Sequence, residues 1–155
     1  MYRWWVFVHI VGVFGFLTAH GASVAVAFRL RGERNPARIQ ALLELSGRSI
    51  NAFFVSLLVL LTGGIVAGFL GHWWAQAWIW VSLGVLVATS LVMFLLGTPY
   101  YKRLRLAAQE ASGGSEVVTE DRLVGVLRSP VPIILAFVGF GALGLILYLM
   151  MFKPF

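Results

Sequence analysis

Residues 131–152 decide the fold, because they read VPIILAFVGFGALGLILYLMMF and contain no charged side chain. A helix of about 20 apolar residues is long enough to cross the hydrocarbon core of a bilayer. Similar apolar stretches precede it at about residues 4–28, 50–70 and 76–96. Lipid offers backbone groups no hydrogen-bond partner, so each stretch is predicted to be a membrane-spanning α-helix. The chain is therefore predicted to be an all-α, polytopic membrane protein built as a four-transmembrane-helix bundle.

The composition agrees with a single membrane domain over residues 1–155. Hydrophobic residues make up 60% of the chain and charged residues 12%, whereas soluble domains carry about 25% charged residues. The mean hydropathy is +0.90. The absence of cysteine excludes disulfides and thiolate metal sites. These values exclude a soluble globule and a nucleic-acid-binding domain, despite the net charge of +6.

Positive charges gather in two loops, at about residues 29–49 and 97–130. The basic residues of the two loops are Arg29, Arg31, Arg34, Arg38, Arg48, Lys102, Arg103, Arg105, Arg122 and Arg128. Basic loops stay on the cytoplasmic side of a membrane. We therefore expect both loops in the cytoplasm of a bacterial inner-membrane protein, with both termini outside. The arginines that follow the first apolar stretch also favour a retained first helix over a cleaved signal peptide.

The first loop is predicted to contain a short helix over residues 35–47. Asn35 is a typical N-cap, Pro36 suits the first helical position, and Gly47 is a typical stop. Its apolar residues share one face, which predicts a helix lying in the plane of the lipid headgroups. In the second loop, the third span is predicted to extend through residues 101–105.

The rest of the second loop is predicted to break and then form another short helix. The break is expected at residues 112–115 (SGGS), because glycine and serine favour turns. A short helix capped near Thr119 is expected next, ending before Ser129, and Pro130 opens the fourth span.

The tryptophans are predicted to form an interfacial belt. They are Trp4, Trp5, Trp73, Trp74, Trp78 and Trp80, near the outer ends of the first three spans. Indole rings favour the headgroup region, where an apolar body meets a polar edge.

No Asp, Glu, Lys or Arg lies inside a span, which argues against proton relays and carboxylate metal centres. Walker-type and hydrolase motifs are absent, so the sequence favours a role other than catalysis and leaves an enzymatic one open. Residues 139–144 (GFGALG) match a dinucleotide pattern by letter, but they lie within an apolar span rather than after a strand. They are predicted to form a smooth helix face open to close approach, as are Gly64 and Gly68 on the second span.

Three histidines are the candidate ligands. His9 and His20 are eleven residues apart on the first span and share a face to within roughly 20°. His72, at the outer end of the second span, is expected at a depth similar to that of His9. The two are the candidate metal ligands.

His20 lies within the bilayer and needs a polar partner. The supporting polar residues predicted at its depth are Ser56, Thr89 and Ser90. In one interpretation, His20 bonds to one of these hydroxyls and joins helices. In the other, His9, His20 and His72 supply ligands to haem b or copper. Both interpretations predict that His9 and His20 face the bundle interior, with Phe7 and Phe14 turned partly to lipid.

Two resemblances extend this interpretation. Residues 8–16 (VHIVGVFGF) resemble the first helix of copper-resistance D (CopD)-like membrane proteins. Residues 20–23 (HGAS), 27–31 (AFRLR) and 41–46 (ALLELS) resemble an uncharacterised family of predicted four-helix bacterial membrane proteins. The wider group includes haem-binding protoporphyrinogen oxidases, so the resemblance implies a haem near His9.

Three functions follow as hypotheses. The first is a bundle that binds haem b through histidine for electron transfer or redox chemistry. The second is an accessory or scaffold subunit, whose partners besides the lipid bilayer are other membrane subunits or a second copy. The third is passage of copper or another small solute.

Overall fold

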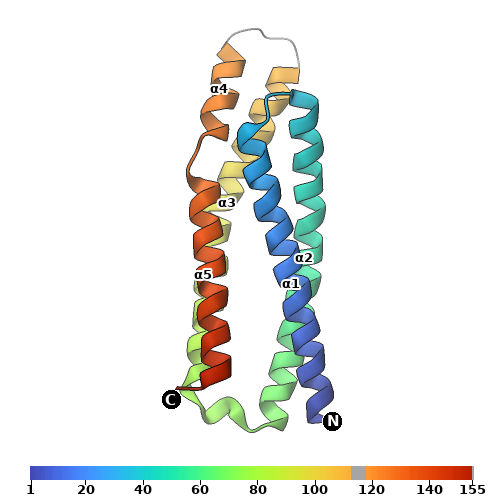
Figure 1. Cartoon of the computed structure of the whole chain (residues 1–155), viewed down its shortest axis with the longest axis vertical. Helices are drawn as coiled ribbons and strands as arrows, with labels where there is room; N and C mark the ends of the chain where they lie inside the picture. The colour runs from blue at the N-terminus through green and yellow to red at the C-terminus, as the bar shows by residue number, and fades with distance from the viewer. Residues whose placement is uncertain (113–117, 155) are drawn as a thin grey trace.

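The computed structural model describes residues 1–112 and 118–154, and every regular element within them is helical (Figure 1). The elements are α1 (Tyr2–Gly32), α2 (Pro36–Leu70), the 3₁₀ turn η1 (Trp73–Ala75), α3 (Ala77–Ser112), α4 (Val118–Leu127) and α5 (Val131–Phe152).

Four helices of the described residues are long and apolar enough to cross a membrane, which confirms the predicted fold class. The candidate spans are Tyr2–Gly32, Ala37–Leu70, Ala77–Ala111 and Leu123–Phe152. Their outer faces carry large apolar side chains such as Phe14, Phe54 and Phe137, which are 67%, 61% and 76% exposed. Phe7 is also exposed, as predicted. Such surfaces are stable against lipid, where apolar exposure carries no hydrophobic penalty.

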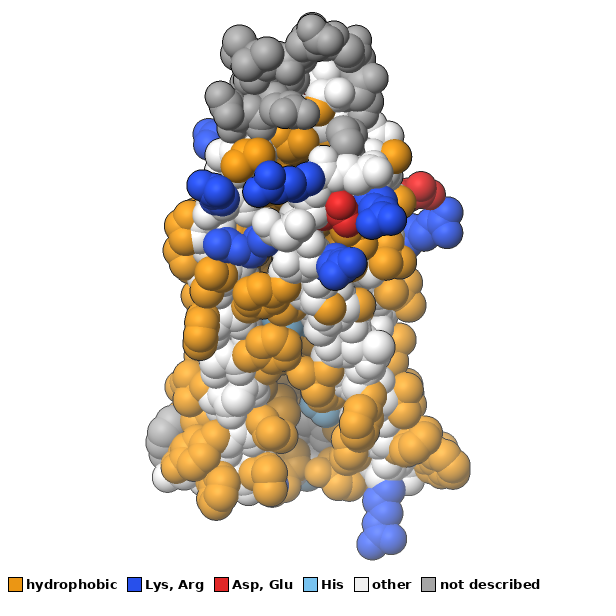
Figure 2. Space-filling view, turned by 45° about the horizontal axis from the view of Figure 1, so that its top comes forward, with side chains coloured by type: hydrophobic (Ala, Val, Ile, Leu, Met, Phe, Trp, Pro, Cys, Tyr) orange, Lys and Arg blue, Asp and Glu red, His pale blue; other side chains and the backbone are white. Residues whose placement is uncertain are grey.

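The bundle consists of two closely packed helix pairs. α1 packs mainly against α2, and α3 mainly against α5, while the two pairs meet over smaller areas. Both chain ends and η1 lie at one end of the bundle, and α4 lies at the other (Figure 1). Lys and Arg side chains gather near the α4 end, while the body of the bundle is largely apolar (Figure 2).

Glycines allow α1 and α2 to approach closely. A Cβ on Gly12 would overlap the Leu60 backbone, and a Cβ on Gly63 would lie 2.8 Å from the His9 Cα. Gly15 faces the Ser56 hydroxyl in the same way. Small residues permit such backbone contact, which supplies the dispersion energy that holds helices together in lipid.

The predicted short helix at residues 35–47 is in fact the first part of α2. The Asn35 side chain accepts hydrogen bonds from the N–H groups of Ala37 (3.0 Å) and Arg38 (3.4 Å), which confirms the N-cap. Gly47, however, does not end the helix. Ile39 is fully buried, so this apolar face packs on other helices rather than on headgroups. Because of this packing, residues 36–47 continue into the rest of α2 as one helix, instead of lying in the plane of the headgroups.

The best-buried side chains lie at the basic end of the bundle. Leu30, Ile39 and Leu104 have no exposed surface, and they belong to one cluster that α1, α2, α3 and α4 all join. The guanidinium of Arg31 also donates to the carbonyl of Ser129 there. The helices are therefore most tightly packed where they extend beyond the apolar stretches at residues 4–28, 50–70 and 76–96.

The second loop largely follows its prediction. α3 continues through residues 101–105, α4 ends at Leu127, and Pro130 precedes the first residue of α5. Of the predicted break at residues 112–115, Ser112 is the last residue of α3 and the rest lie outside the described part of the chain, as does the Thr119 side chain of the predicted cap.

Candidate functional site

His20 faces the bundle interior, as predicted. It is 7% exposed, and its ring meets that of Phe140 of α5 edge-on, with the centroids 5.0 Å apart. Gly139 makes this approach possible, because a Cβ there would overlap both the His20 Nε2 and the Met93 methyl group. The His20 imidazole thus packs against Gly139, the first glycine of the predicted smooth face at residues 139–144.

A small cavity lies beside His20, between α1, α2, α3 and α5. Its volume is about 20 Å³, and its polar or sulfur-bearing lining residues are His20, Thr89, Ser90 and Met93. A space of this size holds one water molecule or one ion. Figure 2 shows the hollow between α5 and the α1–α2 pair, with histidine atoms in its floor.

The His20 Nε2 is buried and has no hydrogen-bond partner among the described residues. Two of the three predicted hydroxyl partners are used elsewhere or lie apart from it. Ser90 donates to the Leu86 carbonyl at 2.8 Å, and Ser56 lies against Gly15, outside the cavity. Thr89 shares the cavity with His20. A buried nitrogen without a partner costs several kcal/mol in a membrane, so a ligand at this atom would stabilise the bundle.

His9 belongs to the α1–α2 contact. Its Nδ1 lies 2.8 Å from the Leu60 carbonyl oxygen, and its ring rests on Gly64. Gly68, the other glycine of the predicted face, accommodates the Trp74 indole instead. The hydrogen bond with the Leu60 carbonyl occupies the Nδ1 atom of His9 and fixes the ring between α1 and α2.

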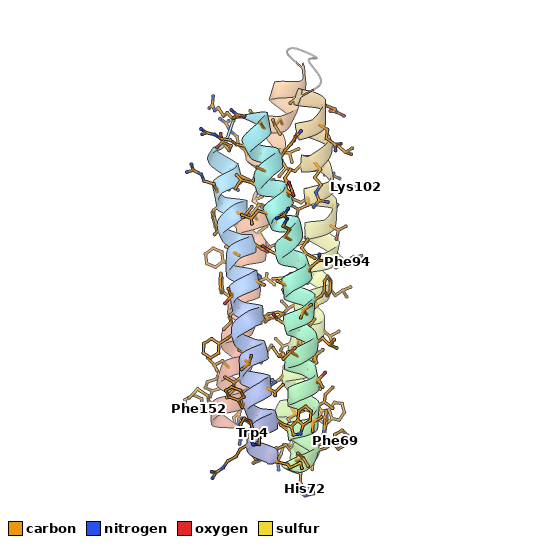
Figure 3. All side chains as sticks on the ribbon, turned by 90° about the vertical axis from the view of Figure 1, so that its right-hand side faces the viewer. Trp4, Phe69, His72, Phe94, Lys102 and Phe152 are labelled. Atoms are coloured by element: carbon orange, nitrogen blue, oxygen red, sulfur yellow. The ribbon has the colours of Figure 1, made fainter. Side chains whose placement is uncertain are left out.

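His9 and His72 are not brought together. Gly64, on which His9 rests, precedes His72 by eight residues, or about 12 Å of helical rise. His72 is exposed, with a left-handed backbone (φ 57°), at the tip between α2 and η1 (Figure 3). The residue of α1 that lies at the level of this tip is Tyr2, rather than His9 as predicted. The Trp73 indole N–H donates a hydrogen bond to the Tyr2 hydroxyl at 3.3 Å.

A porphyrin does not fit this packing. Pockets for organic ligands span about 300–1,000 Å³, whereas the His20 cavity has about 20 Å³. The described residues also contain no group of three or more His, Asp or Glu side chains that could surround a metal ion. His20 and Met93 bring a nitrogen-bearing and a sulfur-bearing side chain to this cavity, beside the hydroxyl-bearing Thr89 and Ser90.

Met93 was missed by sequence reasoning, although a signal was present. It follows Thr89 by four residues and Ser90 by three, so all three share one face of α3. Methionine is ordinarily a packing residue, and only the fold places its thioether beside an imidazole.

The tryptophans of the predicted belt differ in exposure. Trp4 and Trp80 are 72% and 60% exposed at the end that carries the chain termini, whereas Trp78 is buried. The Lys153 ammonium lies 3.9 Å from the centre of the Trp73 ring. A cation–π contact therefore ties the end of α5 to η1.

Four apolar spans with outward-facing aromatic and aliphatic side chains define a multi-pass integral membrane protein. A family model described as a predicted integral membrane protein (DUF2269) matches residues 4–154. The chain belongs to this family, in agreement with the expectation of an uncharacterised membrane family. The comparisons do not support the CopD-like resemblance. No curated protein and no solved structure matched the chain.

Proposed function

We propose that this membrane protein binds a single soft metal ion, copper(I), between His20 and Met93. The observation that carries the proposal is the unpartnered His20 Nε2, which lies in a cavity of about 20 Å³ together with the Met93 side chain. The proposal refines the hypothesis of copper binding or passage and replaces the haem hypothesis, for which the cavity is too small.

Copper(I) matches the donor set. Thioether sulfur selects copper(I), and neutral imidazole is a good copper ligand. Ligation through Nε2 requires the proton of His20 to reside on Nδ1. A monovalent ion also carries a smaller desolvation cost in the bilayer than a divalent ion.

Harder ions lack their preferred ligands in this bundle. The six acidic residues of the chain are Glu33, Glu44, Glu110, Glu116, Glu120 and Asp121, and none lies within the uncharged apolar stretches at residues 4–28, 50–70, 76–96 and 131–152. Calcium, magnesium and manganese favour carboxylate and carbonyl oxygens. A neutral nitrogen–sulfur pair therefore favours a soft ion.

The test is copper(I) binding to the purified protein under reducing conditions, measured by competition with a chromogenic chelator. We expect one ion per chain and loss of binding in His20→Asn and Met93→Leu. His72→Asn and Met151→Leu are the matched controls, because both residues are exposed and distant from the cavity. Absent binding, or equal binding by all variants, would overturn the proposal. A Soret band in the protein from haem-replete cells would favour haem instead.

A second candidate function is an accessory subunit of a larger membrane assembly. Gly141 and Gly144 lie on an exposed face of α5, and a Cβ on either would meet open space. Small residues on a lipid-facing helix allow another helix to approach closely. Purification in mild detergent tests this candidate: a stoichiometric partner that is lost in Gly141→Leu supports it, and a lone chain in wild type contradicts it.

We also propose that the protein resides in a bacterial inner membrane with its basic end in the cytoplasm. The clustering of Lys and Arg side chains at the α4 end supports this orientation (Figure 2). Reporter fusions at Phe155 test it, since an external C-terminus predicts alkaline phosphatase activity and no fluorescence from a cytoplasmic reporter.

A further inference from the structure

A second hollow lies at the basic end of the bundle, between α2 and α3. Its volume is about 580 Å³, and its lining residues are Gln40, Leu43, Glu44, Gly47, Arg48, Asn51, Arg105 and Gln109. We call it the α2–α3 groove. It forms because α2 and α3, although adjacent in the chain, pack over a small area. It is separate from the His20 cavity, and the inference from it does not depend on the proposed function.

Among the residues that the structure describes, one cation of the groove has no carboxylate partner. Arg48 pairs with Glu44 at 2.8 Å, so these two charges largely cancel. Arg105 has no ion pair among the described residues, and its guanidinium points toward Gly47, where a Cβ would lie 3.5 Å from its Nη2. The amide side chain of Gln109 lies in the same groove. The net charge of the groove is therefore +1, surrounded by hydrogen-bonding groups.

The position of the groove suits a lipid headgroup. Asn51, its member nearest the centre of the membrane, lies at the start of the apolar stretch of α2. Beyond it on α2, Phe54 and Leu58 are 61% and 67% exposed. On α3, Phe94 is 65% exposed and lies below Lys102 (Figure 3). A phosphate in the groove would thus have apolar surface beneath it for acyl chains.

We propose that the α2–α3 groove binds the phosphate diester of an anionic phospholipid, with Arg105 as its principal contact. A guanidinium presents a planar fork of donors that matches phosphate oxygens. A headgroup with hydroxyls, such as phosphatidylglycerol, also suits the amide of Gln109, which lies farther from the apolar stretch of α3 than Arg105 does. A zwitterionic headgroup is a poorer match, because its ammonium would have to compete with Arg48 for Glu44.

The test is native mass spectrometry of the full chain in detergent, titrated with phosphatidylglycerol, phosphatidylethanolamine or inorganic phosphate. We expect one retained phosphatidylglycerol and weaker binding of phosphatidylethanolamine. Arg105→Gln should weaken phosphatidylglycerol binding about fivefold, equivalent to about 1 kcal/mol for one basic residue at the membrane surface. Arg103→Gln is the matched control, because it removes the same charge from an exposed position of α3 outside the groove.

A second variant removes space instead of charge. Gly47→Leu would extend a side chain toward Arg105 and should also weaken phosphatidylglycerol binding. Equal losses in Arg103→Gln and Arg105→Gln would overturn the proposal, because they would show nonspecific attraction. Binding of inorganic phosphate that displaces the lipid at equal concentration would also overturn it, because the groove would then recognise soluble phosphate.

Discussion

His9 Nδ1 lies 2.8 Å from the carbonyl oxygen of Leu60, so a side chain of α1 is bonded to the backbone of α2 within the membrane. The contact is possible because Gly63 and Gly64 leave room for the backbone and ring of His9. The α1–α2 pair is therefore a unit with little freedom to shift. α5 approaches that unit at Gly139, where His20 lies.

Gly63→Ala should destabilise the α1–α2 pair. The added Cβ would lie 2.8 Å from the His9 Cα, and a backbone atom cannot move aside as a flexible side chain can. We expect a loss of about 1–3 kcal/mol, as for overpacked cores, measured as the unfolding free energy in detergent. Gly141→Ala is the control, because its Cβ would meet open space. Equal stability of the two variants would show that the helices pack less closely than described.

Leu104→Ala should destabilise the basic end of the bundle. Leu104 is fully buried in the cluster that joins α1, α2, α3 and α4, and its truncation would leave a cavity. The expected cost is about 2–5 kcal/mol of unfolding free energy. Leu106→Ala, at a position 49% exposed on the same helix, should change stability far less. A similar loss in both variants would argue that this cluster is not the main core.

Asn35→Ala should weaken the start of α2. The side-chain oxygen of Asn35 accepts hydrogen bonds from two backbone N–H groups of the helix. Losing such a cap lowers the unfolding free energy by about 1 kcal/mol. Asn35→Asp retains an acceptor at the same position and should preserve stability. Amide hydrogen exchange at residues 37–39 measures the effect locally. Unchanged protection in the alanine variant would contradict the capping role.

Glu33 should make stability depend on pH at the basic end. Hydrogen bonds from the backbone N–H groups of Asn35 and Arg34 lower the pKa of Glu33 below its ordinary value of 4.5. The carboxylate therefore favours the folded state at pH values above 4.5, and this contribution disappears as the pH falls through the lowered pKa. Thermal unfolding from pH 6 to 3 should show a smaller decline in Glu33→Gln than in wild type. Parallel declines would refute this role for Glu33.

The four spans were predictable because lipid imposes a simple length and hydropathy rule on helices. The continuity of α2 through residues 36–70 could not be predicted in this way. Asn35, Pro36 and Gly47 carry ordinary start and stop signals, but Gly47 is overruled by the burial of Ile39 and Leu43 against other helices. Local signals report what a short segment favours on its own, whereas tertiary packing decides whether the helix continues.

Only part of the candidate site could be predicted from the sequence. The inward orientation of His20 follows from the cost of a polar group facing lipid. The partners of the histidines did not follow, because helix register is set by glycine contacts that periodicity does not reveal. Those contacts place His9 on Gly64 and His20 on Gly139, and leave His72 at the tip. Met93 became a candidate ligand only once α3 and α5 were seen to meet beside His20.

X-ray absorption at the copper edge would identify the atoms bound to copper(I) between His20 and Met93. We expect one nitrogen and one sulfur neighbour at the metal in the copper(I)-loaded protein. In Met93→Leu the sulfur contribution should vanish, while Met151→Leu should leave the spectrum unchanged. A spectrum without sulfur in the wild-type protein, or one that Met93→Leu does not alter, would contradict a site between His20 and Met93.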